Sequence, residues 1–290
     1  MPTLHKFGAA ATDLACFALG RRQIVRAARF ALRRASLDVP NGMHTNGEER
    51  LQRWILDLFP GGQKMHVLDV GANIGEWSTS MLSAARQAGR AEDLDLHAFE
   101  PSSYTFARLS KALVTHNVNL QQAALSERSG SSVLHVMGPG AGTNSLHAPP
   151  AGQGATATED VQTITLEEYA DSTGLDDIAL VKIDTEGHDL PVLRGAGSLL
   201  ASQRICVAQF EYNWRWIGAR SFLYDAFNLL EPAGYSLGKL TPRGIEFYPG
   251  WDADLETFVE GNYVAAIPRV ARQLPAVAWW KHSGLRASCA

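Results

Sequence analysis

Short apolar strands alternate with helical stretches over most of this sequence, and this alternation limits the fold more than any other feature. The expected strands are residues 66–70, 94–99, 118–125, 132–137, 178–184 and 205–212, then a hairpin (235–240 and 245–248) and a last strand (262–267). The expected helices are residues 104–116, a stretch from about 190, and 222–230. The sequence therefore predicts an α/β domain with a doubly wound, Rossmann-like, mostly parallel sheet and an antiparallel last strand.

The segments outside this alternation set the predicted domain boundaries. Residues 12–36 are rich in Ala, Leu and Arg, which is typical of an amphipathic helix, and the Pro40-Asn41-Gly42 turn ends it. A second helix, 49–58, precedes the first strand, and residues 138–158 are expected to form a loop. We predict a helical N-terminal extension (1–47), one domain (48–268) and a C-terminal tail (269–290) that carries Trp279 and Trp280.

The charge of the chain is divided unevenly. The formal net charge is −4, which excludes a globally basic nucleic-acid binder. Residues 1–36 hold seven basic residues and one acid, a formal +6, so the remainder carries −10. The basic helix is expected to pack on the domain, with contact to a membrane surface or an anionic partner as the alternative.

The cysteines and the hydropathy bear on the compartment. Cys16, Cys206 and Cys289 are widely spaced and form no CxxC pair, so neither a disulfide framework nor a zinc site is indicated. No run approaches the roughly 20 apolar residues that span a bilayer. The arginines follow the apolar stretch 14–19, whereas a signal peptide places its positive charge first. We expect a cytoplasmic protein without a membrane-spanning segment.

Polar residues at the ends of the first two strands indicate a nucleoside cofactor. The first strand runs into a loop in which Gly71 and Gly75 permit a tight turn close to a ligand. Asn73 stands where a dinucleotide-binding loop has its second glycine, and Asp69 suits a cation better than a pyrophosphate. Glu100, after the second strand, can accept both hydroxyls of a ribose. A cofactor with a ribose and a positive end but no phosphate fits, and S-adenosylmethionine has that shape.

Three sequence blocks carry a family resemblance. They are Asp69-Val-Gly-Ala-Asn-Ile-Gly-Glu-Trp-Ser78, Phe99-Glu-Pro101, and Val181-Lys-Ile-Asp-Thr-Glu-Gly-His188 with Val192-Leu-Arg-Gly195. This pattern resembles the FkbM-type methyltransferases, class I S-adenosylmethionine-dependent enzymes that mostly methylate oxygen atoms of sugars, polyketides and other secondary metabolites. The resemblance covers about residues 64–268, and its third block is the specific one.

The resemblance implies a set of cofactor-binding residues. Around the methionine portion it places Asp69, Gly71, Asn73, Gly75 and Ser78; at the ribose and adenosine, Glu100, Pro101 and Ser102; at the adenine, Ala124, Leu125 and Ser126. Asn144 belongs to a short polar motif, Thr143-Asn144-Ser145, that resembles one found near the site of the family.

The acceptor side is expected at the ends of the strands 178–184 and 205–212. An alcohol needs its proton removed during methyl transfer, so a general base is required. The candidates are Asp184, Glu186, His188 and Glu211. Asp184 has the best location, and the unperturbed pKa of His188, about 6.5, is the most suitable. Lys182 lies beside Asp184 on the same side of the strand. Tyr212 and Trp214 could stack on the acceptor or pack at the rim.

A metal is the less favoured alternative at this site. Asp184, Glu186 and Glu211 could hold a Mg²⁺ that binds a diol. His97 lies inside a strand and is expected to pack, and the other histidines form no HxH or HExxH spacing. No metal-ligating set is therefore predicted.

The predicted function is O-methylation of a small molecule by in-line transfer with base assistance. A nicotinamide-dependent oxidoreductase is one alternative, but Asn73 and Asp69 argue against pyrophosphate binding. A nucleic-acid methyltransferase recruited through the basic helix is another, yet residues 184–187 read Asp-Thr-Glu-Gly and not Asn/Asp-Pro-Pro-Tyr. A binding protein that retains the fold is a third. The extension or the tail could also form a homo-oligomer interface.

Overall fold

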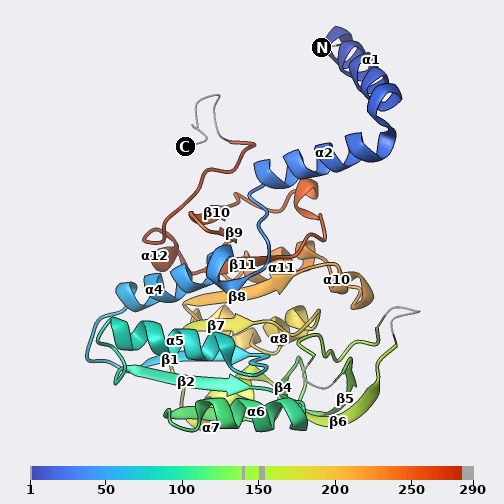
Figure 1. Ribbon diagram of the computed structural model, residues 1–290. Helices are drawn as coiled ribbons and strands as arrows, with labels where there is room; N and C mark the ends of the chain where they lie inside the picture. Colours follow the sequence, from blue (N-terminus) through green and yellow to red (C-terminus); the bar gives the residue numbers. More distant parts are fainter. Residues whose placement is uncertain (1, 139–140, 150–153, 283–290) are drawn as a thin grey trace. The chain divides into compact units, whose positions relative to one another are not determined.

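The structure is a computed structural model that describes residues 2–138, 141–149 and 154–282 (Figure 1). Its internal contacts divide the chain into two compact units, Met1–Pro40 and Asn41–Ala290. The first unit consists of α1 (Pro2–Leu19) and α2 (Arg21–Ala35), which has no buried residue. The single helix predicted over residues 12–36 is wrong, because Gly20 between the two helices has a left-handed φ of 83° that interrupts helical geometry.

Eight strands of the described residues form the main sheet of the second unit, in the order β10-β9-β11-β8-β7-β1-β2-β3. Their bounds are β1 Met65–Val70, β2 Leu94–Phe99, β3 Val118–Gln121, β7 Ile178–Ile183, β8 Val207–Tyr212, β9 Ser236–Thr241, β10 Gly244–Phe247 and β11 Gly261–Ala266. β3, β2, β1, β7 and β8 are parallel, and β11 is antiparallel to both β8 and β9. This confirms the predicted doubly wound, mostly parallel sheet with an antiparallel last strand.

Helices cover both faces of this sheet (Figure 1). They are α3 Met43–Asn46, α4 Glu48–Leu58, α5 Glu76–Gln87, α6 Ser103–Leu113, α7 Leu166–Thr173, α8 Asp189–Arg194, α9 Gly197–Ala201, α10 Arg215–Gly218, α11 Leu223–Leu230 and α12 Pro268–Ala271, with a 3₁₀ turn at Ala253–Leu255. Because both faces are covered, every residue of β7 and β8 is buried, which explains their nearly continuous apolar runs. β1 has β2 on one side and β7 on the other, so the direction of strand addition reverses there. Ligands of such sheets bind at that switch point.

A small second sheet differs from the sequence prediction. The strand expected over 118–125 is two strands, since β3 ends at Gln121 and β4 (Ala124–Leu125) pairs with β6 (Ala157–Ile164), which also pairs with β5 (Gly130–Val136). β6 and α7 were not predicted. Half of the side chains of β6 are exposed, so its sequence is polar and lacks the apolar run on which strand prediction depends.

The segment after β11 packs on the second unit as far as it is described. Trp279 is buried, and its ring lies edge-on against Tyr248 at a centroid distance of 5.3 Å. Ala276 forms a bridge to Ile245 of β10. Among the helices of the described residues, we find none with the length and apolar character needed to cross a membrane.

Candidate functional site

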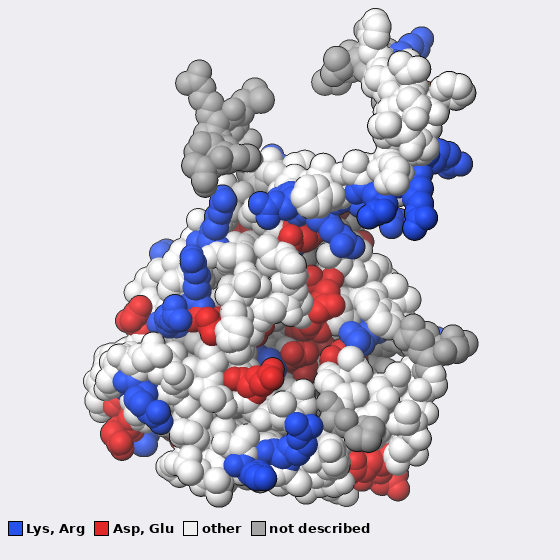
Figure 2. Space-filling view, in the orientation of Figure 1, with Lys and Arg blue, Asp and Glu red and all other residues white. Residues whose placement is uncertain are grey.

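A pocket of about 560 Å³ lies at the carboxyl ends of β1, β2 and β7, next to the switch point. The structure brings ten residues that the sequence singled out into its wall: Gly71, Asn73, Glu100, Pro101, Ala124, Leu125, Asn144, Asp184, Glu186 and His188. Ser145, from the Thr143-Asn144-Ser145 motif, lines it as well, and so does Thr185, which was not predicted as a site residue. Figure 2 shows acidic side chains gathered in the middle of the face in view.

The loop after β1 requires glycine at Gly71. Its φ is 78°, and a Cβ built on it would lie 1.9 Å from the carbonyl oxygen of Asp184. The backbone at the end of β1 therefore touches the backbone at the end of β7 directly. Asn73 also has a left-handed φ, 49°, and its Oδ1 is buried without a hydrogen-bond partner in the pocket wall.

The substitution Gly71→Ala tests this close approach. Alanine in a left-handed conformation costs about 1–2 kcal/mol, and the collision with Asp184 adds about 1–3 kcal/mol of overpacking strain. Gly62→Ala is the matched control, because Gly62 has a φ of 80° and a Cβ added there would meet nothing within 4 Å. In urea unfolding, Gly71→Ala should lose at least about 1 kcal/mol more than Gly62→Ala, and equal losses would contradict the assignment.

Glu100 ties the second strand end to the glycine loop. Its Oε2 accepts a hydrogen bond from the backbone N–H of Asn73, and its Oε1 accepts one from that of Ser102, both at 3.0 Å. Burial raises the pKa of Glu100 to about 7. Its carboxyl group is thus fixed in the pocket wall, while Ser102 contributes its backbone and is itself buried.

A buried ammonium lies beneath the loop. Lys182 Nζ is 3.2 Å from Asp69 Oδ1 and 3.6 Å from Asp184 Oδ2, so it joins the ends of β1 and β7. Burial alone would lower the pKa of Lys182, but the carboxylates of Asp69, Asp184 and Glu48 raise it above its ordinary value. Ser78 Oγ donates a 2.7 Å hydrogen bond to Asp69 Oδ2. Asp69 and Ser78 are therefore buried and bonded to each other, and Asp69 also pairs with Lys182 beneath the loop.

Burial shifts the pKa values of Glu186 and His188, which follow β7, in opposite directions. Glu186 has a left-handed φ of 56° and an ion pair of 2.8 Å to Arg215, yet burial and the neighbouring Asp184 raise its pKa to about 8. His188 lies between Ser126 Oγ (2.9 Å from Nε2) and His147 Nε2 (3.1 Å from Nδ1), and burial lowers its pKa to about 3. His188 does not keep the ordinary imidazole pKa that made it a candidate base, and both of its nitrogens are engaged.

Comparison with known proteins identifies the family. The profile described as "Methyltransferase FkbM domain" matches residues 69–237, which is more than half of the chain. The chain belongs to the FkbM methyltransferase family. No curated protein matches it in sequence.

Solved structures of other methyltransferases are similar at low sequence identity. Precorrin-6y C5,15-methyltransferase from Geobacter metallireducens is 14% identical, with 76% of this chain and 87% of that chain covered and a TM-score of 0.39. Aeropyrum pernix fibrillarin, in complex with S-adenosyl-L-methionine, is 10% identical, with 75% and 74% covered and a TM-score of 0.38. The CMeT domain of citrinin polyketide synthase is 9% identical, with 73% and 50% covered and a TM-score of 0.43.

The pocket of this methyltransferase suits S-adenosylmethionine, the cofactor of the family. Asn73 Oδ1, buried and unpaired, offers an acceptor at the glycine loop, where the amino group of a methionine portion needs one. Two backbone hydrogen bonds fix the carboxyl group of Glu100 in the same wall, and a carboxyl group there could accept the hydroxyls of a ribose. Leu125 and Ala124 supply an apolar wall for the adenine ring of such a cofactor. Gly75, at the start of α5, and Ser126, bonded to His188, are not among the residues that line this pocket.

Glu211 and Tyr212, which were expected on the acceptor side, are both buried. Glu211 is buried, and its carboxylate accepts hydrogen bonds from Asn41 and Asn213, while burial and nearby carboxylates raise its pKa. Tyr212 is fully buried: its hydroxyl donates to Glu256, and its ring packs edge-on against Trp216. The ring of Tyr212 is therefore not free to stack on an acceptor, which favours packing, the other of the two roles expected from the sequence.

Two further pockets of the methyltransferase adjoin the cofactor pocket. A polar one of about 700 Å³ shares Asp184 with it and is lined by Asn41, Glu48 and Lys182. An apolar one of about 1020 Å³ shares Glu186 with it and includes the partly exposed Trp214. Asn41 and Glu48 were not predicted as site residues, because Asn41 was expected in a turn and Glu48 at the start of a helix.

The raised pKa of Glu186 predicts a pH dependence of stability. An unfolded glutamate titrates near 4.3, whereas folded Glu186 does so near 8. Between these values the folded chain holds more protons than the unfolded chain, so stability should fall as pH rises from about 5 to 8. Glu186→Gln should make this slope shallower in urea unfolding, and Glu92→Gln, at an exposed position, should not. An unchanged slope in Glu186→Gln would contradict the burial argument.

Proposed function

We propose that this methyltransferase transfers the methyl group of S-adenosylmethionine to a hydroxyl group of a small molecule. The observation that carries the proposal is the position of Asp184, whose side chain borders both the cofactor pocket and the adjoining polar pocket. A carboxylate at that border can take the proton of an acceptor hydroxyl where the two ligands meet.

Positioning supplies much of the rate in a displacement of this kind. S-adenosylmethionine supplies an electrophilic methyl group on a sulfonium. The hydrogen bond from the Asn73 backbone N–H to Glu100 fixes the glycine loop against the end of β2 in the pocket wall. Lys182 holds the Asp184 carboxylate at the strand end, with the two groups 3.6 Å apart.

Of the four candidate bases expected from the sequence, Asp184 is the one that we propose. A base must be unprotonated when it acts, and it must reach the acceptor. Burial raises the pKa of Glu186 to about 8, and its carboxyl group is engaged by Arg215 at 2.8 Å. Burial lowers the pKa of His188 to about 3, which makes it a weak base with both nitrogens engaged, and Glu211 is buried and hydrogen-bonded to Asn41. The side chain of Asp184 is 38% exposed and therefore open to an acceptor.

The polar pocket favours an acceptor rich in hydroxyl groups. Asn41, Glu48 and Lys182 offer hydrogen-bonding side chains around it. The Mg²⁺ alternative is not favoured, because the three side chains that would hold the ion already have partners: Asp184 lies beside Lys182, Glu186 beside Arg215, and Glu211 accepts hydrogen bonds from Asn41 and Asn213. Base-assisted transfer without a metal fits these pairs.

The test measures release of S-adenosylhomocysteine from the full chain with panels of sugars, polyketide alcohols, amines and RNA. We expect turnover with an alcohol, and a product whose new methyl group is bonded to oxygen, as determined by NMR. Methylation of carbon or nitrogen, or turnover with RNA alone, would overturn the hydroxyl assignment. Absence of S-adenosylhomocysteine binding in calorimetry would overturn the cofactor site itself.

A further inference from the structure

A trio of side chains lies toward the amino-terminal ends of β1 and β2, whereas the cofactor pocket lies at their carboxyl ends. His66 is the second residue of β1 and Asp95 the second residue of β2, and the parallel register places them side by side. His97 follows two residues after Asp95, so its side chain projects from the same face of β2. The methyl-transfer site described above uses none of these residues.

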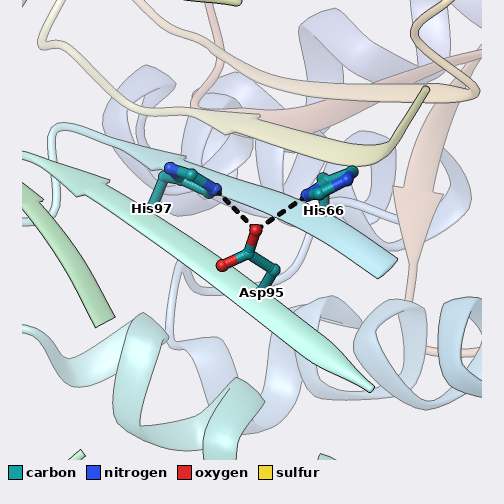
Figure 3. Close-up of side chains that lie close together, drawn as sticks. All are labelled: His66, Asp95 and His97. Atoms are coloured by element: carbon teal, nitrogen blue, oxygen red, sulfur yellow. Dashed lines mark hydrogen bonds and ion pairs between the residues drawn. The ribbon is translucent and has the colours of Figure 1, made fainter. Parts of the chain in front are cut away.

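The three side chains point at one another (Figure 3). His66 Nδ1 lies 2.9 Å from Asp95 Oδ2, and His97 Nε2 lies 3.3 Å from the same oxygen. The three atoms all lie within 4.8 Å of one another. Bond lengths of about 2.0–2.2 Å to zinc place neighbouring ligand atoms about 3.3 Å apart. The two measured spacings are close to this, and the partly exposed His66 ring can rotate toward the same centre.

Outer hydrogen bonds hold two of the three side chains in this orientation. The other ring nitrogen of His97, Nδ1, is 2.7 Å from the Tyr169 hydroxyl, and Asn119 Nδ2 donates to Asp95 Oδ1 at 3.0 Å. Metal-binding histidines and carboxylates are oriented by such partners in the same way. The trio therefore has both an inner set of donor atoms and the support that such a set requires.

His97 Nε2 is a donor atom that this cluster leaves without a well-aligned hydrogen bond. This nitrogen is buried, and its polar neighbour is Asp95 Oδ2 at 3.3 Å. The Tyr169 hydroxyl can accept the Nδ1–H of this ring at 2.7 Å, and in that tautomer the Nε2 lone pair is available to a cation beside Asp95.

We propose that His66, Asp95 and His97 bind a divalent transition-metal ion of the zinc type, with water as a fourth ligand. Two imidazoles and one carboxylate are a donor set that such ions prefer. The side chains of His66 and Asp95 are 22% and 26% exposed, which leaves a path from solvent. The ion links the amino-terminal ends of β1 and β2, so it stabilises the sheet and takes no part in methyl transfer.

The test is calorimetric titration of Zn²⁺ into the tag-free full chain after chelator treatment. We expect one ion per chain. His66→Gln, Asp95→Asn and Asn119→Ala should each weaken binding by more than about tenfold. His147→Gln is the matched control, since His147 and His188 form another close imidazole pair, and it should bind as the wild type does. His66 is partly exposed, so His66→Gln should fold.

Two readouts decide the outcome. Co²⁺ should give the intense visible absorption of a tetrahedral site in the wild type and lose it in Asp95→Asn, and saturating Zn²⁺ should raise Tm in the wild type only. Absence of stoichiometric Zn²⁺ uptake, or full affinity in His66→Gln, would overturn the proposal. S-adenosylhomocysteine binding should be unchanged in His66→Gln, which separates this result from any failure of the proposed function.

Discussion

Asp184→Asn should lower kcat by about 10²–10⁴-fold while the affinity for S-adenosylhomocysteine changes little. The reason is that asparagine keeps the shape of the side chain but cannot take a proton, and general-base assistance contributes about 10²–10⁴-fold. The measurement is steady-state turnover with the acceptor from the screen, together with calorimetric binding of S-adenosylhomocysteine. The loss should appear in kcat, because the acceptor can still bind beside the amide.

A matched control separates the base from a general loss of charge. Asp176→Asn removes one acid at a side chain that is 99% exposed, and it should retain full turnover. If Asp184→Asn also retained full turnover, Asp184 would not be the base. If instead kcat stayed normal and only cofactor binding fell, the residue would belong to the cofactor site.

The sequence was sufficient for the parts of the site that depend on local pattern. Gly71, Asn73 and Glu100 directly follow buried strands, and a parallel sheet brings such strand ends to one edge. The backbone contact between Gly71 and Asp184 follows from the same geometry, since β1 and β7 are neighbours. These residues could be predicted because strand ends are visible in hydrophobic periodicity.

Contacts between distant segments could not be predicted in this way. Asn41 reaches Glu211 across 170 positions, and nothing in the sequence around either residue indicates the other. The change at His188 has the same origin, because its low pKa depends on burial and on His147, which belongs to a loop. The trio of His66, Asp95 and His97 is divided between two strands, so it has no short motif.

The charge pattern also gains a physical meaning. The sequence assigned a formal −10 to the residues after the basic extension. In the structure, Glu48, Asp69 and Asp184 lie around one buried ammonium, that of Lys182. Part of the negative charge is therefore internal and held by a single cation, so the stability of the site should depend strongly on that residue.

Lys182→Met is expected to be the most destabilising substitution in this region. Removing one partner of a buried ion pair leaves the other charge uncompensated, which costs about 3–5 kcal/mol. Asp69 is fully buried, and its Oδ1 faces Lys182 at 3.2 Å, so it would carry that cost. Urea unfolding should show a lower midpoint with an unchanged slope. Lys111→Met, at an exposed position of α6, should change stability by less than about 0.5 kcal/mol.

The double variant Lys182→Met with Asp69→Asn distinguishes a lost charge partner from lost packing. If the uncompensated carboxylate causes the loss, then neutralising Asp69 should recover part of the stability, because the amide needs no cation. Ser78 can still bond to the asparagine side chain, so the position keeps a polar partner. No recovery would mean that the ammonium acts mainly through its packing and its 3.5 Å contact with the Gly71 carbonyl oxygen. Recovery of stability without recovery of turnover would show that Lys182 also positions Asp184 for proton removal.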